Sequence, residues 1–426
     1  MTRKLPPIVV SRRERTIEGR WQGARSWFGG VPCLGDQPWP TCPRTGKPLP
    51  FAAQLDLAEL ALAKRIWPLP PGGSLAFFLG AGAVVHVPAD AHRRPTRTPE
   101  GVTPAYDPAG GLFPERPSHW AKQTFPYWPV EFTALETGDV PGELPDDAVY
   151  AHMEAAVSRR FVRRNYFFSA RSAFEAIGVS GTPMWWHGAQ RYIEKLKIAR
   201  FHSVGIAKAR VAGLEAARAE AMRLEPKKIF GLFERRGEPS GAFAEALITL
   251  DQHEEQYDGL QRQLTGLDQF IAAVESFAGD KDPWALMAPD ETKQFATMFE
   301  HAKQAFPELL RNRIPYRIDD LATESLLAMT TGDEMAFSAM PPAILDLINR
   351  DYRLPTQGWH QVLGLGLNIQ GNAAAENDSK HMLLQLVYDD MMGWRFGDLG
   401  AFQFWISPRD LEAGNWDGAT LSFESC

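Results

Sequence analysis

Two short series of residues, one near each end of the chain, constrain the fold most strongly. Each series contains two glycines, one glutamine and a pair of aromatic residues: Gly30, Gln54, Gly73 and Phe77-Phe78, then Gly364, Gln385, Gly400 and Phe404-Trp405. The intervals are 24, 19 and 4 residues in the first series and 21, 15 and 4 in the second. This order predicts two related strand-turn-strand halves, although short strands with glycine turns also recur by chance in β-rich proteins.

The segments around these residues are typical of strands. Residues 51–57, 74–80, 382–388 and 401–406 are aromatic and aliphatic runs bounded by glycine, proline or aspartate. Residues 84–87 and 129–135 predict two more strands, and the many prolines of residues 86–150 exclude long helices there. Asp56 could also begin a short helix at Ala58. Residues 1–20 are polar and basic, and we expect an arm or a first edge element.

The middle of the chain has the composition of helices. Residues 206–224 predict an amphipathic helix, and residues 241–277 predict helical packing that breaks near Gly259 or Gly266. Further helices are expected from Pro289 to about Pro307 and at residues 319–329 and 341–350. The prediction is therefore an α+β fold: a mixed or antiparallel β-rich body of two pseudo-repeated halves with a large helical insertion. The expected division is 1–145 for the N-terminal half, 146–350 for the insertion and 351–426 for the C-terminal half.

Composition restricts the class of protein. The chain has 426 residues, a formal net charge of -7 and 44% hydrophobic residues, so it can bury a sizeable core and is not a general nucleic-acid binder. Three cysteines make a disulfide framework unexpected and favour a reducing cytoplasm. The apolar run at Ile8 is too short for a signal peptide, and no apolar stretch is long enough to span a bilayer, so no membrane association is expected.

Gln54 and Gln385 are polar residues inside strands that are expected to be buried. A buried amide needs hydrogen-bond partners for both its oxygen and its nitrogen. One interpretation is that the two amides converge on a ligand between the halves. The interpretation we favour is that each amide bonds loop backbone at the end of its strand and fixes the neighbouring turn.

Three other residues are candidates for ligand binding: Trp39, His360 and Asp398. Trp39 and His360, with Trp359, could line an aromatic pocket, but tryptophan and lone histidines are more often structural. Asp398 lies between glycines, which favours a turn over a catalytic carboxylate. Asp389 and Asp390, followed by Gly393, are expected to form a solvent-facing hairpin loop. Trp185-Trp186-His187 is a second aromatic cluster with the same two interpretations.

No metal site or cofactor is expected. Cys42-Pro43-Arg44-Thr45-Gly46 resembles half of a zinc knuckle, but Thr45 stands where the second cysteine would be. The sequence contains no phosphate-binding loop, no dinucleotide-binding glycine fingerprint, no nucleophile elbow and no metalloprotease helix motif. The absence of these motifs makes an enzyme less expected without excluding one.

The residues of the two ends resemble a known family. Gly29-Gly30-Val31-Pro32, Trp39-Pro40, residues 48–57 and residues 73–78, together with residues 360–423, are similar to the YwqG-like family of bacterial proteins, a domain of unknown function. The resemblance covers residues 26 to about 80 and about 355 to 426. It implies an α+β fold and carries no chemistry with it. The long helical middle of this chain departs from the family.

Two functions are compatible with these observations. The first is a non-catalytic binding or protein-interaction module, in which the helical insertion recognises a partner protein. The alternative is a hydrolase-like enzyme that uses Asp398, His360, Gln54 and Gln385 in a groove between the halves. They differ in one geometric respect: the second requires these four residues to share a cleft. The sequence leaves the oligomeric state open.

Overall fold

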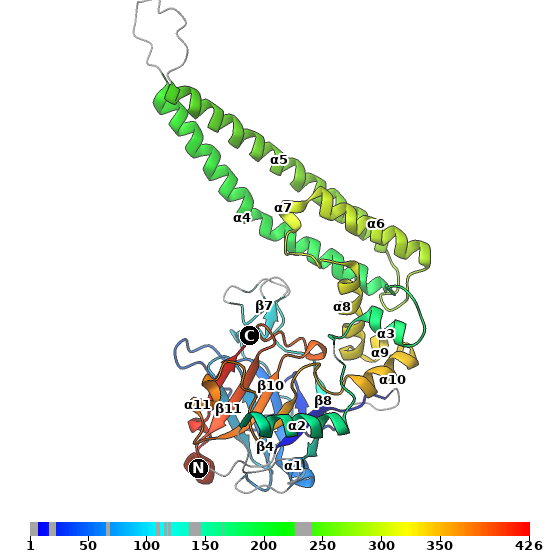
Figure 1. Cartoon of the computed structure of the whole chain (residues 1–426). Helices are drawn as coiled ribbons and strands as arrows, with labels where there is room; N and C mark the ends of the chain where they lie inside the picture. The colour runs from blue at the N-terminus through cyan, green and yellow to red at the C-terminus, as the bar shows by residue number, and fades with distance from the viewer. Residues whose placement is uncertain are drawn as a thin grey trace, which may run out of the picture. The chain divides into compact units, whose positions relative to one another are not determined.

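The structure is a computed structural model that describes residues 7–16, 23–64, 69–107, 111–114, 117, 121–135, 146–164, 166–225 and 241–426. It has an α+β fold, as predicted (Figure 1). Two compact units are present: unit 1 comprises Met1–Thr182 and Leu326–Cys426, and unit 2 comprises Pro183–Ser325. Residues 146–182 and 326–350 therefore group with the strands, whereas the helical insertion forms a unit of its own from Pro183. The expected boundary between the N-terminal half and the insertion, at residue 145, lies outside the described residues.

Unit 1 contains a ten-stranded sheet in which all neighbouring pairs of described strands are antiparallel. The order across the sheet is β12-β11-β10-β9-β1-β8-β2-β3-β4-β5. The bounds are β1 Ile8–Arg12, β2 Trp27–Phe28, β3 Phe51–Asp56, β4 Ser74–Phe78, β5 Ala83–Val87, β8 Trp128–Ala134, β9 His360–Val362, β10 His381–Val387, β11 Ala401–Ile406 and β12 Thr420–Glu424. A separate two-stranded sheet joins β6 (Tyr106–Asp107) to β7 (Gly111–Leu112).

The sheet confirms the two pseudo-repeated halves. Strands β2 to β5 follow one another on one side of the central β1 and β8 pair, and β9 to β12 do so on the other. Gln54 is paired with Trp27 and Ala76, and Gln385 is paired with Gln361 and Gln403. A register shift occurs at the same place in each half: between Phe51 and Ala53 in β3, and between Met382 and Leu384 in β10. The two halves therefore share topology, register and irregularity.

The sheet is curled, so that its two outer strands approach each other. The imidazole of His86 in β5 stacks on the indole of Trp416, with ring centroids 5.6 Å apart. A Cβ atom at Gly82, just before β5, would overlap the side chain of Leu421 in β12. The inner faces of the two halves consequently share a single core.

Strand β1 lies at the centre of the sheet and corrects the expectation of an arm or an edge element. It pairs with β8 on one side and β9 on the other. Its β-branched residues Ile8, Val9 and Val10 are fully buried. The basic character of the segment misled the prediction, because Arg12 is buried too: its guanidinium bonds the Tyr352 carbonyl and forms an ion pair with Asp389.

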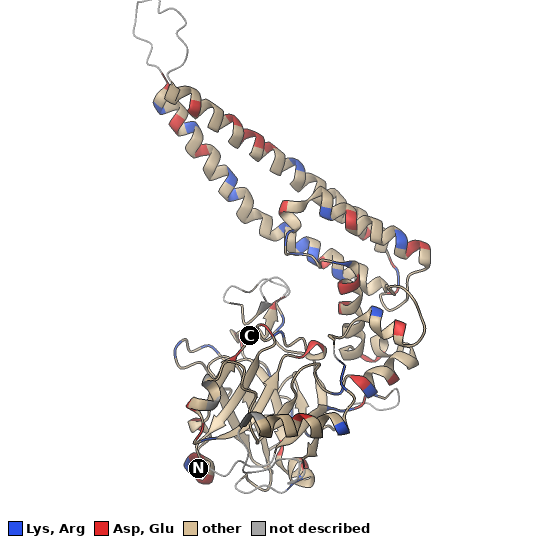
Figure 2. Ribbon diagram, viewed as in Figure 1, with Lys and Arg blue, Asp and Glu red and all other residues tan. Residues whose placement is uncertain are grey.

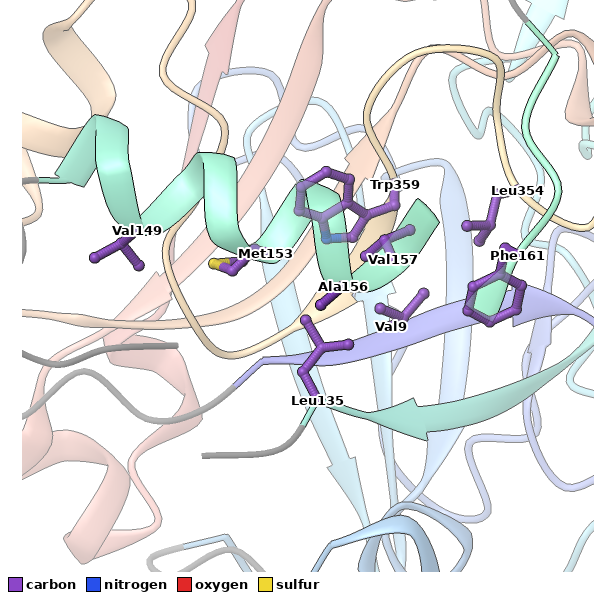
Figure 3. Packing of buried hydrophobic residues seen from close by; sticks show 9 residues of the cluster. All are labelled: Val9, Leu135, Val149, Met153, Ala156, Val157, Phe161, Leu354 and Trp359. Atoms are coloured by element: carbon purple, nitrogen blue, oxygen red, sulfur yellow. The ribbon is translucent and has the colours of Figure 1, made fainter. Parts of the chain in front are cut away.

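Helix α2 (Asp146–Arg160) covers one part of this sheet. Figure 3 shows its apolar side chains facing Val9 of β1 and the indole of Trp359. The buried residues of this layer are Val9, Leu135, Val149, Met153, Ala156, Val157, Phe161, Leu354 and Trp359. The other helices of unit 1 are α1 Leu57–Ala63, α3 Ala170–Ala176, α9 Glu334–Ser338, α10 Pro342–Asp351, α11 Asn372–Glu376 and α12 Pro408–Ala413, with short 3-10 turns η2 Asp390–Met392 and η3 Trp416–Gly418.

Unit 2 is built on two long helices, α4 (Trp186–Leu224) and α5 (Gly241–Ala278). The remaining helices are α6 Pro289–Ala305 and α7 Pro307–Leu310, and α8 Ile318–Thr331 crosses the division between the units. Helix α5 passes through Gly259 and Gly266 without the predicted break. A mid-helix glycine costs only about 1 kcal/mol relative to alanine, and a Cβ at Gly266 would lie 3.0 Å from the ring of Phe306, so packing favours the glycine there.

None of the helices in the described part of the chain combines the length and apolar character needed to cross a bilayer.

Candidate functional site

A cavity of about 830 Å³ lies in unit 1 beside the first half of the sheet. Its walls come from the segment before β2, the turn after β2, the end of β3, the start of β4, the loop after β5 and the residue before β8. The side chains that matter for its chemistry are Arg25, Trp27, Cys33, Asp56, Arg93 and Tyr127. This size suits a small-molecule ligand.

Asp56 is the buried charged group of the cavity. Its Oδ1 atom accepts hydrogen bonds from the backbone N–H groups of Ala58 and Glu59, which caps the N-terminus of α1. Its Oδ2 atom accepts from Arg25 Nε and Arg93 Nη2, both at 3.0 Å. The Asp56 side chain is 2% exposed, whereas those of Arg25 and Arg93 are 43% and 55% exposed. Both carboxylate oxygens are therefore occupied, and the two guanidinium groups remain open to solvent.

The sequence around Asp56 explains its position. Asp56 is the last residue of β3 and directly precedes helix α1. It therefore begins a short helix, which was one of the two expectations for this residue. The Ser26 hydroxyl accepts from the Asp56 backbone N–H at 2.9 Å and donates to Glu59 Oε2 at 2.6 Å. Three elements thus hold the carboxylate at the cavity wall: the segment before β2, strand β3 and helix α1.

The Gln54 amide also lines the cavity, and its contacts are those that the structural interpretation predicts. Its Oε1 accepts from the Cys33 backbone N–H at 2.7 Å, and its Nε2 donates to the Cys33 carbonyl at 2.9 Å and to Ser74 Oγ at 2.7 Å. Gln385 is engaged in the same way: its Oε1 accepts from Leu367 N–H at 2.6 Å, and its Nε2 donates to the Trp359 carbonyl. Both glutamines fix the loop that precedes their strand.

Two cavity groups that could ionise are held in their neutral forms. Burial raises the pKa of the Cys33 thiol, and the Arg93 charge offsets part of that rise. Burial raises the pKa of Tyr127 to about 12. At neutral pH the cavity therefore offers two guanidinium groups, the Glu334 carboxylate, the His92 imidazole, other hydrogen-bonding groups and the apolar surfaces of Trp27 and Val87, but no activated thiolate.

The other predicted site residues lie elsewhere. Trp39 is half-buried, packs edge-on against Phe78 and donates its indole N–H to the Leu49 carbonyl at 2.9 Å. Asp398 is exposed, and its backbone carbonyl accepts from the N–H of Cys426. Neither lines the cavity around Gln54.

His360 is fully buried and belongs to the core of the second half. Its Nδ1 accepts from the Val387 backbone N–H at 3.2 Å, which leaves the proton on Nε2, 3.0 Å from Asp389 Oδ2. Burial lowers the pKa of His360, and the hydrogen bond to Asp389 offsets part of this effect. Asp389 is 2% exposed, which corrects the expected solvent-facing loop: the carboxylate turns inward because Arg12 and His360 are its partners.

Residues of the two aromatic clusters pack against other aromatic rings. Trp359 is fully buried and its indole stacks on the Tyr150 ring at 4.9 Å, so it contributes to the core under α2. Trp185 and Trp186 are buried in unit 2, and His187 stacks on Trp284. Within the described ranges, no group of three histidine, cysteine or acidic side chains is arranged to hold a metal ion.

Arg25 and Arg93 were not predicted as site residues. They are 68 residues apart, each lies in a loop, and neither belongs to a motif of fixed spacing. The one signal was Asp56, a capping residue that directly follows a buried strand. A buried carboxylate needs a cationic partner, but the sequence does not indicate which arginine supplies it.

A family model described as a domain of unknown function, DUF1963, matches residues 26–96 and 249–425, which together make up more than half of the chain. The match includes both halves of the sheet from β2 to β5 and β9 to β12, and it extends into α5. No curated protein matches the chain.

Proposed function

This chain belongs to the family described as a domain of unknown function, DUF1963, and we propose that it is a non-catalytic, YwqG-like binding protein whose ligand occupies the cavity beside Asp56. The observation that carries the proposal is the pair of half-exposed arginines, Arg25 and Arg93, held on one buried carboxylate at an otherwise largely apolar cavity. A ligand with an anionic group and an apolar body fits such a site.

The charge of the site favours an anion. The Asp56 carboxylate faces two guanidinium groups and has no oxygen left for a ligand. Each guanidinium carries five N–H donors, so donors beyond those bonded to Asp56 are available on both side chains. Glu334 also lines the cavity, but it is exposed, so water screens its charge.

The second half of the sheet provides an internal comparison. Val87, which lines the cavity, pairs with Ser74 at the end of β5, and the equivalent residue of β12 is Glu424, which pairs with Ala401. The Glu424 carboxylate accepts hydrogen bonds from three loop N–H groups, those of Ile369, Gln370 and Ala373. In the second half, loop N–H groups therefore bind the carboxylate of Glu424. In the first half, the equivalent residue is Val87, which forms part of the cavity wall. This parallel supports a carboxylate as the anionic group of the ligand.

Binding fits the site better than catalysis. Hydrolysis needs a base or an activated nucleophile near the substrate. The Asp56 carboxylate is fully bonded, and burial keeps the Cys33 thiol and the Tyr127 hydroxyl protonated. The two other cavity groups that could act as a base, His92 and Glu334, are exposed to solvent. His360, Gln385 and Asp398 do not line this cavity.

Ligand-detected NMR with matched pairs of compounds tests the proposal. Phenylacetate and octanoate have an anionic group and an apolar body, and phenylacetamide and octanamide have the same bodies without the charge. We expect the carboxylates to bind the full chain and the amides to bind at least tenfold more weakly, because only a carboxylate forms charge-assisted hydrogen bonds with Arg25 and Arg93.

Two variants assign the binding to this cavity. Arg93→Ala should weaken carboxylate binding, whereas Arg94→Ala should not, since Arg94 is an exposed neighbour that does not line the cavity. Equal binding of acid and amide, or equal loss in the two variants, would contradict the proposal. Thermal melts of both variants check that they fold as the parent does.

The same proposal extends to location. Cys33, Cys42 and Cys426 are all free thiols, which supports a reducing cytoplasm as the place where the protein acts. Fractionation of the native source followed by immunodetection measures this directly. Recovery of the protein in a membrane or secreted fraction would contradict it.

A further inference from the structure

The C-terminal end of α2 carries a dense group of arginines. Four arginines lie within six residues, at positions 159, 160, 163 and 164, and Figure 2 shows basic residues where α2 ends. Arg164 forms an ion pair with the buried carboxylate of Asp351. The other three, Arg159, Arg160 and Arg163, line a single cavity. Three like charges are therefore gathered around one hollow of unit 1.

This hollow, which we call the α2 cavity, has a volume of about 770 Å³. Its walls come from α2, the segment that follows α2 and the loops on either side of β9. It shares no lining residue with the cavity beside Asp56. Ser158, Thr356 and Gln357 also line it, so hydroxyl and amide groups accompany the arginines.

Arg163 is the most buried charge of the α2 cavity, with a side chain that is 13% exposed. Its carboxylate partner, Glu154, is 54% exposed and lies 3.3 Å away. Its Nη2 atom donates to the carbonyls of Thr356 and Gly358 at 3.4 and 3.3 Å, and its Nε atom has no hydrogen-bond partner among the described residues. Charge-assisted hydrogen bonds are usually about 2.7 to 2.9 Å long. The Arg163 charge is therefore only partly compensated, which is costly for a group so far from water.

The α2 cavity as a whole has an excess of positive charge. Three arginines and one glutamate line it, and three positive charges less one negative charge leave a formal charge of +2. Arginines in the last turn of a helix often serve its C-terminal carbonyls, and Arg160 does donate to the Ala156 carbonyl at 3.2 Å. Arg163 lies three residues beyond the end of α2, so this role does not account for it. A doubly charged anion matches the excess.

We propose that the α2 cavity is a second ligand site, which binds a small phosphomonoester with its phosphoryl group on Arg163. A phosphoryl group carries about −1.5 to −2 charges at pH 7 and has three strong acceptor oxygens. It therefore neutralises the excess charge and accepts hydrogen bonds from several arginine N–H groups at once. The half-buried side chains of Tyr150 and Leu367 provide apolar surface for the organic part of the ester. This site is independent of the function proposed for the cavity beside Asp56.

Two matched probes test the charge of the ligand. Phenyl phosphate and phenyl sulfate have the same organic part, but near pH 7.5 the phosphate carries almost two charges and the sulfate carries one. Isothermal titration calorimetry of the full chain should show phenyl phosphate binding at least about tenfold more tightly than phenyl sulfate, because the second charge meets uncompensated arginines. Arg93→Ala should bind phenyl phosphate as the parent does, which separates this site from the cavity beside Asp56.

A pair of double variants locates the binding. Arg159→Ala with Arg160→Ala should weaken phenyl phosphate binding at least about tenfold, since hydrogen bonds to charged groups are lost. The matched control, Arg97→Ala with Arg409→Ala, removes two exposed arginines of unit 1 that do not line the α2 cavity and should bind as the parent does. Thermal melts check that both variants fold.

A single variant tests the charge balance in the opposite direction. Glu154→Gln removes the negative charge of the α2 cavity at an exposed position and should tighten phenyl phosphate binding by at least about threefold. Arg163→Ala should abolish binding, and if this variant fails to fold, Glu154→Gln still decides the question. Absence of binding by the parent, equal affinity for phosphate and sulfate, equal loss in the two double variants, or unchanged affinity in Glu154→Gln would each overturn the proposal. Loss of phenyl phosphate binding in Arg93→Ala would overturn it too, because the probe would then occupy the cavity beside Asp56.

Discussion

The rings of Phe77 and Phe404 meet edge to face, with centroids 5.1 Å apart and an interplanar angle of 66°. The two residues are equivalents in the two halves of the sheet, and both are fully buried. The contact therefore joins β4 to β11 across the curled sheet, although these strands are not neighbours within it. Each half completes the core of the other, so neither half buries its inner face alone.

Replacing Phe404 with alanine should lower the free energy of unfolding by about 3 to 5 kcal/mol, because a fully buried ring leaves a cavity. Phe77→Ala should cost a similar amount. The double variant should cost less than the two single losses together, by about 0.5 to 1.5 kcal/mol, which is the expected coupling of an aromatic pair. Urea denaturation of the four proteins measures this cycle.

Phe423→Ala is the control for that cycle. Phe423 also lies in the second half, but it is 47% exposed, so its loss should cost under about 1 kcal/mol. Strictly additive losses at Phe77 and Phe404 would show that the two halves do not stabilise each other through this contact.

Replacing Gln385 with leucine should lower the free energy of unfolding by about 1 to 3 kcal/mol, because loop N–H and carbonyl groups would lose their partners. Gln54→Leu should cost less. Centrality does not distinguish the two, since β3 and β10 occupy equivalent places in the sheet. Each amide has a third bond, that of Gln54 with Ser74 and that of Gln385 with Gln403. Gln385 has the larger expected effect because it is fully buried, whereas Gln54 lines the cavity, where water could replace its amide. Thermal melts of the two variants compare them, and a parent-like melt of Gln385→Leu would contradict this account.

The ends of the chain were predictable because their strands carry a local signal. Strands β3, β4, β10 and β11 are apolar runs bounded by turn residues, and their pairing needs only the antiparallel rule. The central position of strand β1 was not predicted. Arg12 of this strand is buried against Asp389, and the two residues are 377 positions apart in the sequence. A contact between residues so far apart in the sequence leaves no local pattern from which it could be predicted.

The candidate site was less predictable than the fold for the same reason. Gln54 was found because a polar residue inside an apolar strand is conspicuous. Arg25 and Arg93 were missed because each lies in a loop, and only the folded sheet brings both to Asp56. The turn at Asp389 was misread because aspartates before a glycine usually face solvent, whereas here a buried arginine and histidine turn one of them inward.

Gly29→Ala should be strongly destabilising for a reason other than backbone conformation. Gly29 has φ 60°, and its equivalent in the second half, Leu363, has φ 62°, so a side chain tolerates this conformation in the same fold. The difference is that a Cβ at Gly29 would overlap the Pro126 carbonyl oxygen. We expect a loss of at least twice that of the control Gly393→Ala, which has φ 65° and open space around its Cβ position and should cost about 1 kcal/mol. Equal losses in urea denaturation would exclude the contact with Pro126 as the cause.

The contribution of His360 to the stability of unit 1 should decrease as the pH falls from 7 to 5, because burial lowers the pKa of His360. Asp390 acts in the opposite direction below about pH 6, because burial and the Asp389 charge raise its pKa to about 6. A histidine with a lowered pKa in the folded state is neutral there but takes up a proton in the unfolded chain below about pH 6.5. Its contribution is therefore complete above that pH and is lost as the pH falls, with a slope of up to about 1.4 kcal/mol per pH unit for one proton. Arg12 and His360 lower the pKa of Asp389 despite its burial, so the Asp389 contribution is lost only in a separate window, below about pH 4.

Urea denaturation at several pH values, comparing the parent with His360→Asn, isolates this effect. The variant should be less stable at pH 7, since the Val387 N–H and Asp389 lose their partner, and its stability should change less between pH 7 and pH 5. Burial lowers the pKa of His187 in unit 2 to about 4, so this residue adds to the parent slope, and only the difference between parent and variant reports on His360. A variant with the same slope as the parent would show that His360 does not titrate differently in the folded and unfolded states.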